Sequence, residues 1–241
     1  MSDDEGLASR LDQVRARVRR AAERAGRDPR GVRILAVTKA HPAAAIDAAL
    51  RAGIADIGES RVQEAMAKQS ELPGRMATWH MIGHVQRNKA RAAAAIFDVV
   101  HSVDSARLGS ALERYRAPAD HPLTVLIEVE LTGIPGRSGV SADVAPALLA
   151  ELRRLPRLEP VGLMTIAPPG SQDRARDCFA RLRALRDRLS GDQSLSLPEL
   201  SMGMSDDFEV AVAEGSTMVR LGRVLFGDRS EAQPGAGPPL S

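Results

Sequence analysis

Residues 32–42 read VRILAVTKAHP, an apolar run that ends in a polar turn and a proline. A short, unbroken apolar run of this kind is typical of a buried strand in a parallel sheet. Pro42 favours the first turn of a helix, so the pattern predicts a strand, a turn and a helix. The turn from Thr38 to Pro42 lacks the Gly-x-Gly-x-x-Gly pattern of a dinucleotide-binding fold.

The alternation of strand and helix repeats along the chain, after a helix predicted over residues 6–26 from the spacing of its apolar residues. Strands are predicted at 32–37, 55–58, 78–82, 97–103, 123–131, 158–166, 199–202 and 217–221, and helices at 42–52, 61–69, 88–96, 104–115, 142–154, 172–189 and 206–214. Strands joined by helical crossovers pair in parallel, and eight such units close into a barrel. The sequence therefore predicts an α/β fold, a single (β/α)8 TIM-type barrel with an extra N-terminal helix. An open doubly wound sheet is the alternative.

The length of 241 residues fits one large domain, and we expect a barrel over 1–230 and a disordered, Pro- and Gly-rich tail over 231–241. With a net charge of +2, 2% aromatic residues and arginines that alternate with acids, a nucleic-acid partner is not expected. The sequence has no apolar run long enough to span a membrane, and its N-terminus is acidic. A cytoplasmic protein without a membrane partner is therefore predicted. The single cysteine, Cys178, is expected to be a buried small hydrophobe.

Lysine is rare in this arginine-rich chain and occurs only at Lys39, Lys68 and Lys89. Lys39 follows the first strand, and the sites of such barrels lie at the carboxyl ends of the strands. A lysine desolvated there would have a lowered pKa and a nucleophilic amine that can form an imine, which an arginine cannot do. A solvent-exposed loop lysine is the equally weighted alternative.

The turns after the last two predicted strands suggest an anion site. The stretch from Leu200 to Ser205 leads into a helix that Ser205 is expected to cap, and Gly203 and Gly222 allow close approach of the backbone. Barrels often bind phosphate between these two loops. Arg220 lies within the final strand and needs a partner if it is buried. The alternative is that the glycines only shape turns and Ser205 only caps.

Other features are weaker. His80 and His84 have a spacing found in metal sites, but no carboxylate or cysteine joins them, so no metal is predicted. Glu59 and Glu64 either bind a ligand or only cap a helix and form part of its solvated surface. The basic turn at 136–139 either folds over a ligand or is an ordinary loop.

Several motifs follow one another in a fixed order over residues 7–228. They are AVTK at 36–39, GESRVQE at 58–64, WHMIG at 79–83 with QRNK at 86–89, RSG at 137–139, GLM at 162–164, LSMGMSDD at 200–207 and GSTMVRLG at 215–222. Together they resemble the YggS/PROSC-type pyridoxal phosphate homeostasis proteins, whose fold is similar to the N-terminal barrel of alanine racemase, the fold-type III arrangement.

The resemblance implies that pyridoxal 5′-phosphate is held as a Schiff base on Lys39, that Arg220 faces the pyridine nitrogen, and that Ser201 and Ser205 hold the phosphate with backbone groups. The cofactor-binding residues implied or expected are Lys39, Ser60, His80, Met164, Ser201, Met204, Ser205, Arg220, Gly222 and Arg223. A guanidinium beside the ring nitrogen disfavours its protonation, which makes the ring a poorer electron sink.

Three places depart from the family pattern. Ser60 and Arg61 stand where the family usually has asparagine and an aromatic residue, Arg223 where it has threonine or serine, and Arg137 where many relatives have lysine. We expect cofactor binding to persist with altered affinity, or the chain to be a divergent paralogue.

Two functions are compatible with the resemblance: a carrier without catalytic turnover in vitamin B6 homeostasis, and an amino-acid racemase or related enzyme. Racemisation by two bases needs a second proton donor, which in alanine racemase-like enzymes is a tyrosine from another domain. The only tyrosine here, Tyr115, falls at a helix end on the predicted outer layer. The carrier is therefore the favoured prediction, as a monomer that can supply apo-enzymes dependent on the cofactor.

Overall fold

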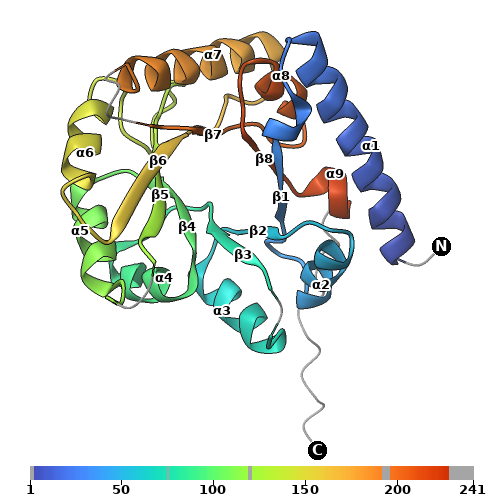
Figure 1. Cartoon of the computed structure of the whole chain (residues 1–241), viewed down its shortest axis with the longest axis horizontal. Coiled ribbons are helices and arrows are strands. Elements are labelled where there is room, and N and C mark those ends of the chain that lie inside the picture. The colour runs from blue at the N-terminus through green and yellow to red at the C-terminus, as the bar shows by residue number, and fades with distance from the viewer. Residues whose placement is uncertain (1–2, 75, 119–120, 192–195, 228–241) are drawn as a thin grey trace, which may run out of the picture.

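The computed structural model describes residues 3–74, 76–118, 121–191 and 196–227. In it eight parallel strands form a closed barrel in the order β1 to β8, and β8 pairs with β1 (Figure 1). The prediction of a single (β/α)8 barrel is therefore confirmed. The predicted disordered tail, 231–241, lies outside the described residues, and so does the domain boundary at residue 230.

The elements lie close to their predicted positions. The strands are β1 Arg33–Val37, β2 Asp56–Glu59, β3 Thr78–Met81, β4 Val99–Val103, β5 Leu123–Glu128, β6 Leu158–Met164, β7 Glu199–Ser201 and β8 Met218–Leu221. The helices are α1 Asp3–Arg24, η1 Pro29–Gly31, α2 Ala43–Arg51, α3 Val62–Glu71, η2 Arg87–Lys89, α4 Ala90–Ile96, α5 Ala106–Tyr115, α6 Ala145–Leu152, α7 Gln172–Leu189, α8 Phe208–Ala213 and α9 Arg223–Phe226. Four of the predicted strands end one to three residues too late, because the residues after them turn away at the carboxyl end of the barrel.

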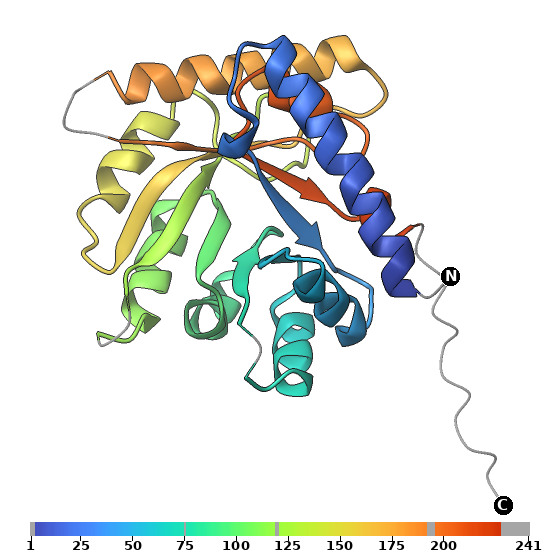
Figure 2. The same cartoon turned by 45° about the vertical axis from the view of Figure 1, so that its right-hand side comes forward.

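The extra N-terminal helix, α1, runs along the outside of the barrel beside β8 and α8 (Figure 2). It buries the apolar stripe Leu7, Leu11, Val14 and Val18 against the last units of the barrel, where it contacts α8 and α9. Since α8 and α9 are short, α1 covers a part of the wall that they leave open. The helix was predicted to reach residue 26 but ends at Arg24, and Ala25 is exposed.

The region after β7 differs from the prediction. Ser205 does not cap the following helix: α8 begins after Asp207, which makes no side-chain cap bond, while the Ser205 hydroxyl accepts a hydrogen bond from the Val224 N–H at 3.3 Å. The reason is a tight turn in which Asp207 accepts from the Met204 N–H. The four-residue helix α9 was not predicted, because it is too short to show a helical period.

Cys178 is buried in α7, as predicted, and Tyr115 ends α5 with 41% of its surface exposed. Among the described residues, no helix combines the length and the apolar character needed to cross a bilayer.

Candidate functional site

Lys39 lies in the turn between β1 and α2, at the carboxyl end of the barrel. The next residue, Ala40, has a φ of 61°, a left-handed conformation that is unfavourable for a residue with a side chain. The turn is closed by a hydrogen bond from the His41 N–H to the Thr38 carbonyl at 2.9 Å. A strained residue next to Lys39 requires neighbouring groups that hold the turn in place.

Three side chains of β2 and α3 supply these contacts. The buried Lys68 amine donates to the Thr38 carbonyl at 2.8 Å and to the carboxylates of Glu59 and Glu64 at 2.7 Å each. Glu59 also accepts from the Thr38 hydroxyl at 2.6 Å, and Glu64 accepts from the Ala40 N–H at 2.6 Å. The residues on both sides of Lys39 are thus tied to one buried ion cluster.

The charge of the buried Glu59 carboxylate is only partly compensated in this cluster. Burial raises the pKa of Glu59, although the hydrogen bonds and charge of Lys68 oppose the shift. Its Oε2 atom has no hydrogen-bond partner in the described part of the chain. Removing the lysine would therefore leave a buried carboxylate with little compensation.

Arg220 faces the mouth of the barrel from β8, and 4% of its surface is exposed. Its guanidinium donates to the carbonyl and the hydroxyl of Ser201 at 2.7 and 2.8 Å, and to the Thr165 carbonyl at 2.9 Å. Burial lowers the pKa of Arg220 to about 10, although the charges of Asp207 and Glu128 oppose the shift. Arg220 is therefore a fixed, charged donor whose direct acceptors are all neutral.

The loops after β7 and β8 meet beside Arg220. Ser205 contacts the first turn of α9 through the Val224 N–H, and the Arg223 guanidinium pairs with Asp206 across the two loops. Gly203 has a φ of +96°, and a Cβ built there would lie 2.5 Å from the Ala211 Cβ. Only glycine fits at this position, so the loop can pack directly on α8.

These segments enclose a cavity of about 400 Å³, a size that suits a small organic ligand. It is lined by Val37, Lys39, His41, Ile82, Met204, Ser205, Asp206, Arg220, Gly222, Arg223 and Gly227. The predicted residues brought together here are Lys39, Met204, Ser205, Arg220, Gly222 and Arg223. The cavity thus offers the Lys39 amine together with two guanidinium groups, a hydroxyl and a glycine-containing turn.

The other predicted residues do not line this cavity. Met164 is buried at the end of β6, and the backbone of Ser60 packs against Gly83. His80 and Ser201 are buried inside the barrel, where each bonds to His101. Contact of these four side chains with a cofactor remains a prediction.

Sequence reasoning missed some residues of the cavity. His41 and Asp206 stand in the turns that were singled out, so their position was an available signal. Ile82 and Gly227 gave none, because an apolar residue after a strand and a glycine near the chain end fit many structural roles.

A smaller cavity of about 210 Å³ adjoins the first at Ile82 and includes Glu128, Arg137 and His84 in its lining. Burial, with the charge of Asp104 in support, raises the pKa of Glu128 to about 7. Arg137, from the basic turn at 136–139, donates to the Ile166 and Ala167 carbonyls at the end of β6. The turn therefore folds over the barrel mouth.

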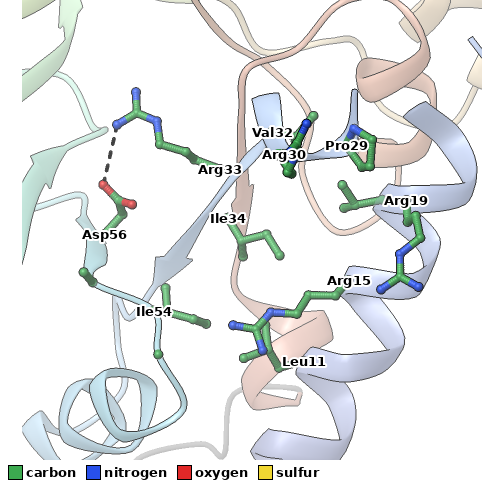
Figure 3. A pocket seen from close by; sticks show the side chains of 13 residues that line it. Leu11, Arg15, Arg19, Pro29, Arg30, Val32, Arg33, Ile34, Ile54 and Asp56 are labelled. Atoms are coloured by element: carbon green, nitrogen blue, oxygen red, sulfur yellow. Dashed lines mark ion pairs between the residues drawn. The ribbon is translucent and has the colours of Figure 1, made fainter. Parts of the chain in front are cut away.

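A further cavity, of about 380 Å³, lies at the opposite end of the barrel beside α1 (Figure 3). Arg15, Arg19, Arg30 and Arg33 line it, but Arg30 pairs with Asp28, and Arg33 bonds Glu199 at 2.7 Å and lies 3.8 Å from Asp56. Because much of its charge is already paired and barrel sites lie at the other end, we place the candidate site at the carboxyl end.

Comparison with known proteins identifies the family of the chain. The model of the family described as alanine racemase, N-terminal domain, matches residues 9–230. The pyridoxal phosphate homeostasis protein of Pseudomonas aeruginosa is 44% identical over 229 residues, which are 95% of this chain and 98% of that protein. The protein of the same name from Escherichia coli K12 is 38% identical over 92% of this chain and 97% of its own length.

Solved structures are similar over the whole barrel. PipY of Synechococcus elongatus PCC7942, solved with pyridoxal phosphate bound, has a TM-score of 0.80 and 40% identity over 92% of this chain and all of its own. Alanine racemase of Clostridium difficile 630 has a TM-score of 0.72 at 13% identity, with 92% of this chain matched to 56% of that one, which shows a shared fold. The chain therefore belongs to the alanine racemase N-terminal domain family and, within it, to the pyridoxal phosphate homeostasis proteins.

Proposed function

We propose that this protein binds pyridoxal 5′-phosphate at the carboxyl end of its barrel and acts in the homeostasis of that cofactor. The observation that carries the proposal is the single cavity that contains the Lys39 amine, the Arg220 guanidinium and the Ser205–Gly222 region. These donors fit the three polar ends of the cofactor: an aldehyde, a ring nitrogen and a phosphate. When bound, pyridoxal phosphate supplies an aldehyde that condenses with amines and a ring that accepts electrons.

Each group of the chain has a separate task in this proposal. Lys39 provides the amine that retains the aldehyde, and its turn is held by the cluster around Lys68. Ser205, Gly222 and Arg223 hold the phosphate with hydroxyl, backbone and guanidinium donors. The relatives' names and the cofactor in PipY support binding of pyridoxal phosphate by this protein.

The charge of Arg220 favours a carrier over an enzyme. If the ring nitrogen lies at the Arg220 guanidinium, the guanidinium would disfavour protonation of that nitrogen, because two adjacent positive charges repel each other. The ring would then be a poorer electron sink. Tyr115, the only tyrosine in the sequence, is exposed at the end of α5 and is not one of the cavity residues.

One observation favours the alternative, an amino-acid racemase or related enzyme. Glu128 lies in the adjoining cavity, and its pKa of about 7 suits a general acid or base at neutral pH. A chiral assay with alanine and other amino acids decides between the two. We expect turnover no faster than that of the free cofactor, whereas clearly faster turnover that is lost in Glu128→Gln would establish the enzyme.

The binding proposal is tested by titrating the ligand-free protein with pyridoxal phosphate and recording visible absorbance. The wild type and Lys89→Ala, a lysine outside the cavity, should give the same saturable band, and Lys39→Ala should not. Equal bands in all three proteins would refute the assignment of Lys39.

The cellular setting belongs to the same proposal. We propose that the protein works in the cytoplasm as a monomer and passes the cofactor to apo-enzymes that depend on it. Light scattering of the purified protein tests the monomer. Activation of an apo-transaminase by the loaded protein, compared with an equal amount of free cofactor, tests the transfer.

A further inference from the structure

A chain of hydrogen bonds crosses the interior of the barrel beneath the candidate site. Asp56 Oδ1 lies 2.9 Å from His80 Nε2, His80 Nδ1 lies 2.9 Å from His101 Nε2, and His101 Nδ1 lies 2.8 Å from the Ser201 hydroxyl. The Ser201 hydroxyl is in turn 2.8 Å from the Arg220 guanidinium. Since His101 is on β4 and Ser201 on β7, which are not neighbours in the sheet, the chain passes through the barrel.

The members of this hydrogen-bond chain connect the two ends of the barrel. His80, His101 and Ser201 are fully buried, while Arg220 lines the cavity at the carboxyl end. Asp56 begins β2 and lines the cavity at the amino end, where Figure 3 shows it beside Arg33. A row of buried polar side chains in a barrel core is costly unless every member is satisfied.

With both histidines neutral, the two ends fix the direction of every bond. A guanidinium can only donate and a carboxylate can only accept. Ser201 therefore accepts from Arg220 and gives its own proton to His101 Nδ1, His101 donates from Nε2 to His80 Nδ1, and His80 donates from Nε2 to Asp56. Burial lowers the pKa of His101 well below its usual value, which agrees with a neutral ring.

The competing arrangement places a proton on both nitrogens of His80. His101 would then donate from Nδ1 to the Ser201 hydroxyl, which already accepts from Arg220. The hydroxyl proton of Ser201 would have no acceptor among the described residues. A second buried cation would also join Arg220 in the same core.

We propose that Asp56, His80 and His101 are positioning residues that hold the Ser201 hydroxyl, and through it the Arg220 guanidinium that lines the cofactor cavity, in one hydrogen-bond pattern. The relay, defined as Asp56, His80, His101 and Ser201, links the negative charge at the amino end of the barrel to the buried cation at the carboxyl end. Hydrogen bonds aligned in one direction polarise and strengthen one another. This role of the relay in ligand binding rests on the proposed function, whereas its proton arrangement does not.

The proton arrangement is tested on the ligand-free protein by ¹⁵N NMR of labelled histidine side chains at neutral pH. We expect His80 and His101 to be neutral, with the proton on Nε2 and none on Nδ1. An imidazolium at His80, or a proton on Nδ1 of either ring, would overturn the relay.

The link to ligand binding is tested with two matched charge removals. Asp56 and Glu199 both contact Arg33, and their side chains are 20% and 21% exposed, but Asp56 alone bonds to His80. We expect Asp56→Asn to raise the dissociation constant for pyridoxal phosphate by about three- to tenfold, a coupling typical of a shared network. Glu199→Gln should change it by less than about twofold, as expected for a residue outside the network.

The same variants show whether the effect travels through the relay. The His101 ¹⁵N signals should shift in Asp56→Asn more than in Glu199→Gln. Equal effects of the two variants on affinity and on His101 would refute the positioning role. A wild type that binds no cofactor but shows the expected tautomers would instead refute the proposed function and leave the arrangement intact.

Discussion

Replacing Lys68 with methionine is expected to destabilise the protein and the turn that carries Lys39. The side chain is 6% exposed, and its amine makes three hydrogen bonds of 2.7–2.8 Å, two of them to carboxylates. Methionine keeps the length and the apolar stem but leaves Glu59 buried without a cation. Breaking a buried ion pair in this way costs about 3–5 kcal/mol, a large part of a typical domain stability of about 5–15 kcal/mol.

A second substitution tests whether the stability lost in Lys68→Met comes from the buried Glu59 carboxylate. Glu59→Gln in the Lys68→Met background replaces the uncompensated charge by an amide, and should restore about 1–3 kcal/mol. Glu59 already has a raised pKa from burial, and it rises further without Lys68. A carboxyl whose pKa is raised in the folded state favours the folded protein at low pH, and this contribution is lost as pH rises. The loss in free energy of unfolding caused by Lys68→Met should therefore be smaller at pH 5 than at pH 7.5.

The assay is equilibrium unfolding of the ligand-free protein in urea, followed by circular dichroism and extrapolated to water. Lys89→Met is the matched control, a lysine outside the cluster, with an expected change within about 0.5 kcal/mol. The reasoning is refuted if Lys68→Met costs less than about 1 kcal/mol, or if Glu59→Gln destabilises the variant further.

Three further predictions follow from single sites. Because the pKa of Glu128 is raised to about 7, ionisation of Glu128 should destabilise the folded protein as pH rises from about 4.5 to 7. In urea unfolding, the stability of wild type relative to Glu128→Gln should therefore increase by roughly 3 kcal/mol from pH 7.5 to pH 4.5, and a pH-independent difference would contradict this. Gly203→Ala should destabilise by about 2–4 kcal/mol, since its Cβ would lie 2.5 Å from that of Ala211, and an unchanged unfolding midpoint would show that the loop adapts. Ser205→Ala should weaken pyridoxal phosphate binding about tenfold in an absorbance titration, the value of one good hydrogen bond, and an effect below twofold would remove Ser205 from the phosphate site.

The barrel and the two halves of the site follow from local sequence pattern. Eight apolar runs separated by helical segments require parallel pairing, and the position of Lys39 after the first strand places it at the barrel mouth. Arg220 was singled out because a charged residue in a strand core needs a partner. In each case a short stretch of sequence contains the whole physical argument.

The relay and the Lys68 cluster could not be predicted in this way. His101 stands in an apolar strand and Lys68 on a helix, and neither position carries a motif. Ser201 is 100 residues from His101 and the Thr38 carbonyl is 30 residues from Lys68, so only the i,i+4 pair of Glu64 and Lys68 is local in the sequence. Only the packing of strands and helices in the folded barrel brings these groups together.

Local propensity also failed at Ser205. A serine before two aspartates is a typical helix start, but the turn that Asp207 makes with Met204 delays the helix and frees Ser205 to contact α9. Ser205 therefore lines the cavity beside α9 and does not cap α8.

The attachment point of the cofactor is measured most directly by borohydride reduction of the loaded protein, followed by digestion and mass spectrometry of the peptides. We predict one added pyridoxyl phosphate group per chain, on the peptide that contains Lys39. A label on Lys68, Lys89 or the N-terminus, with Lys39 unmodified, would contradict the account.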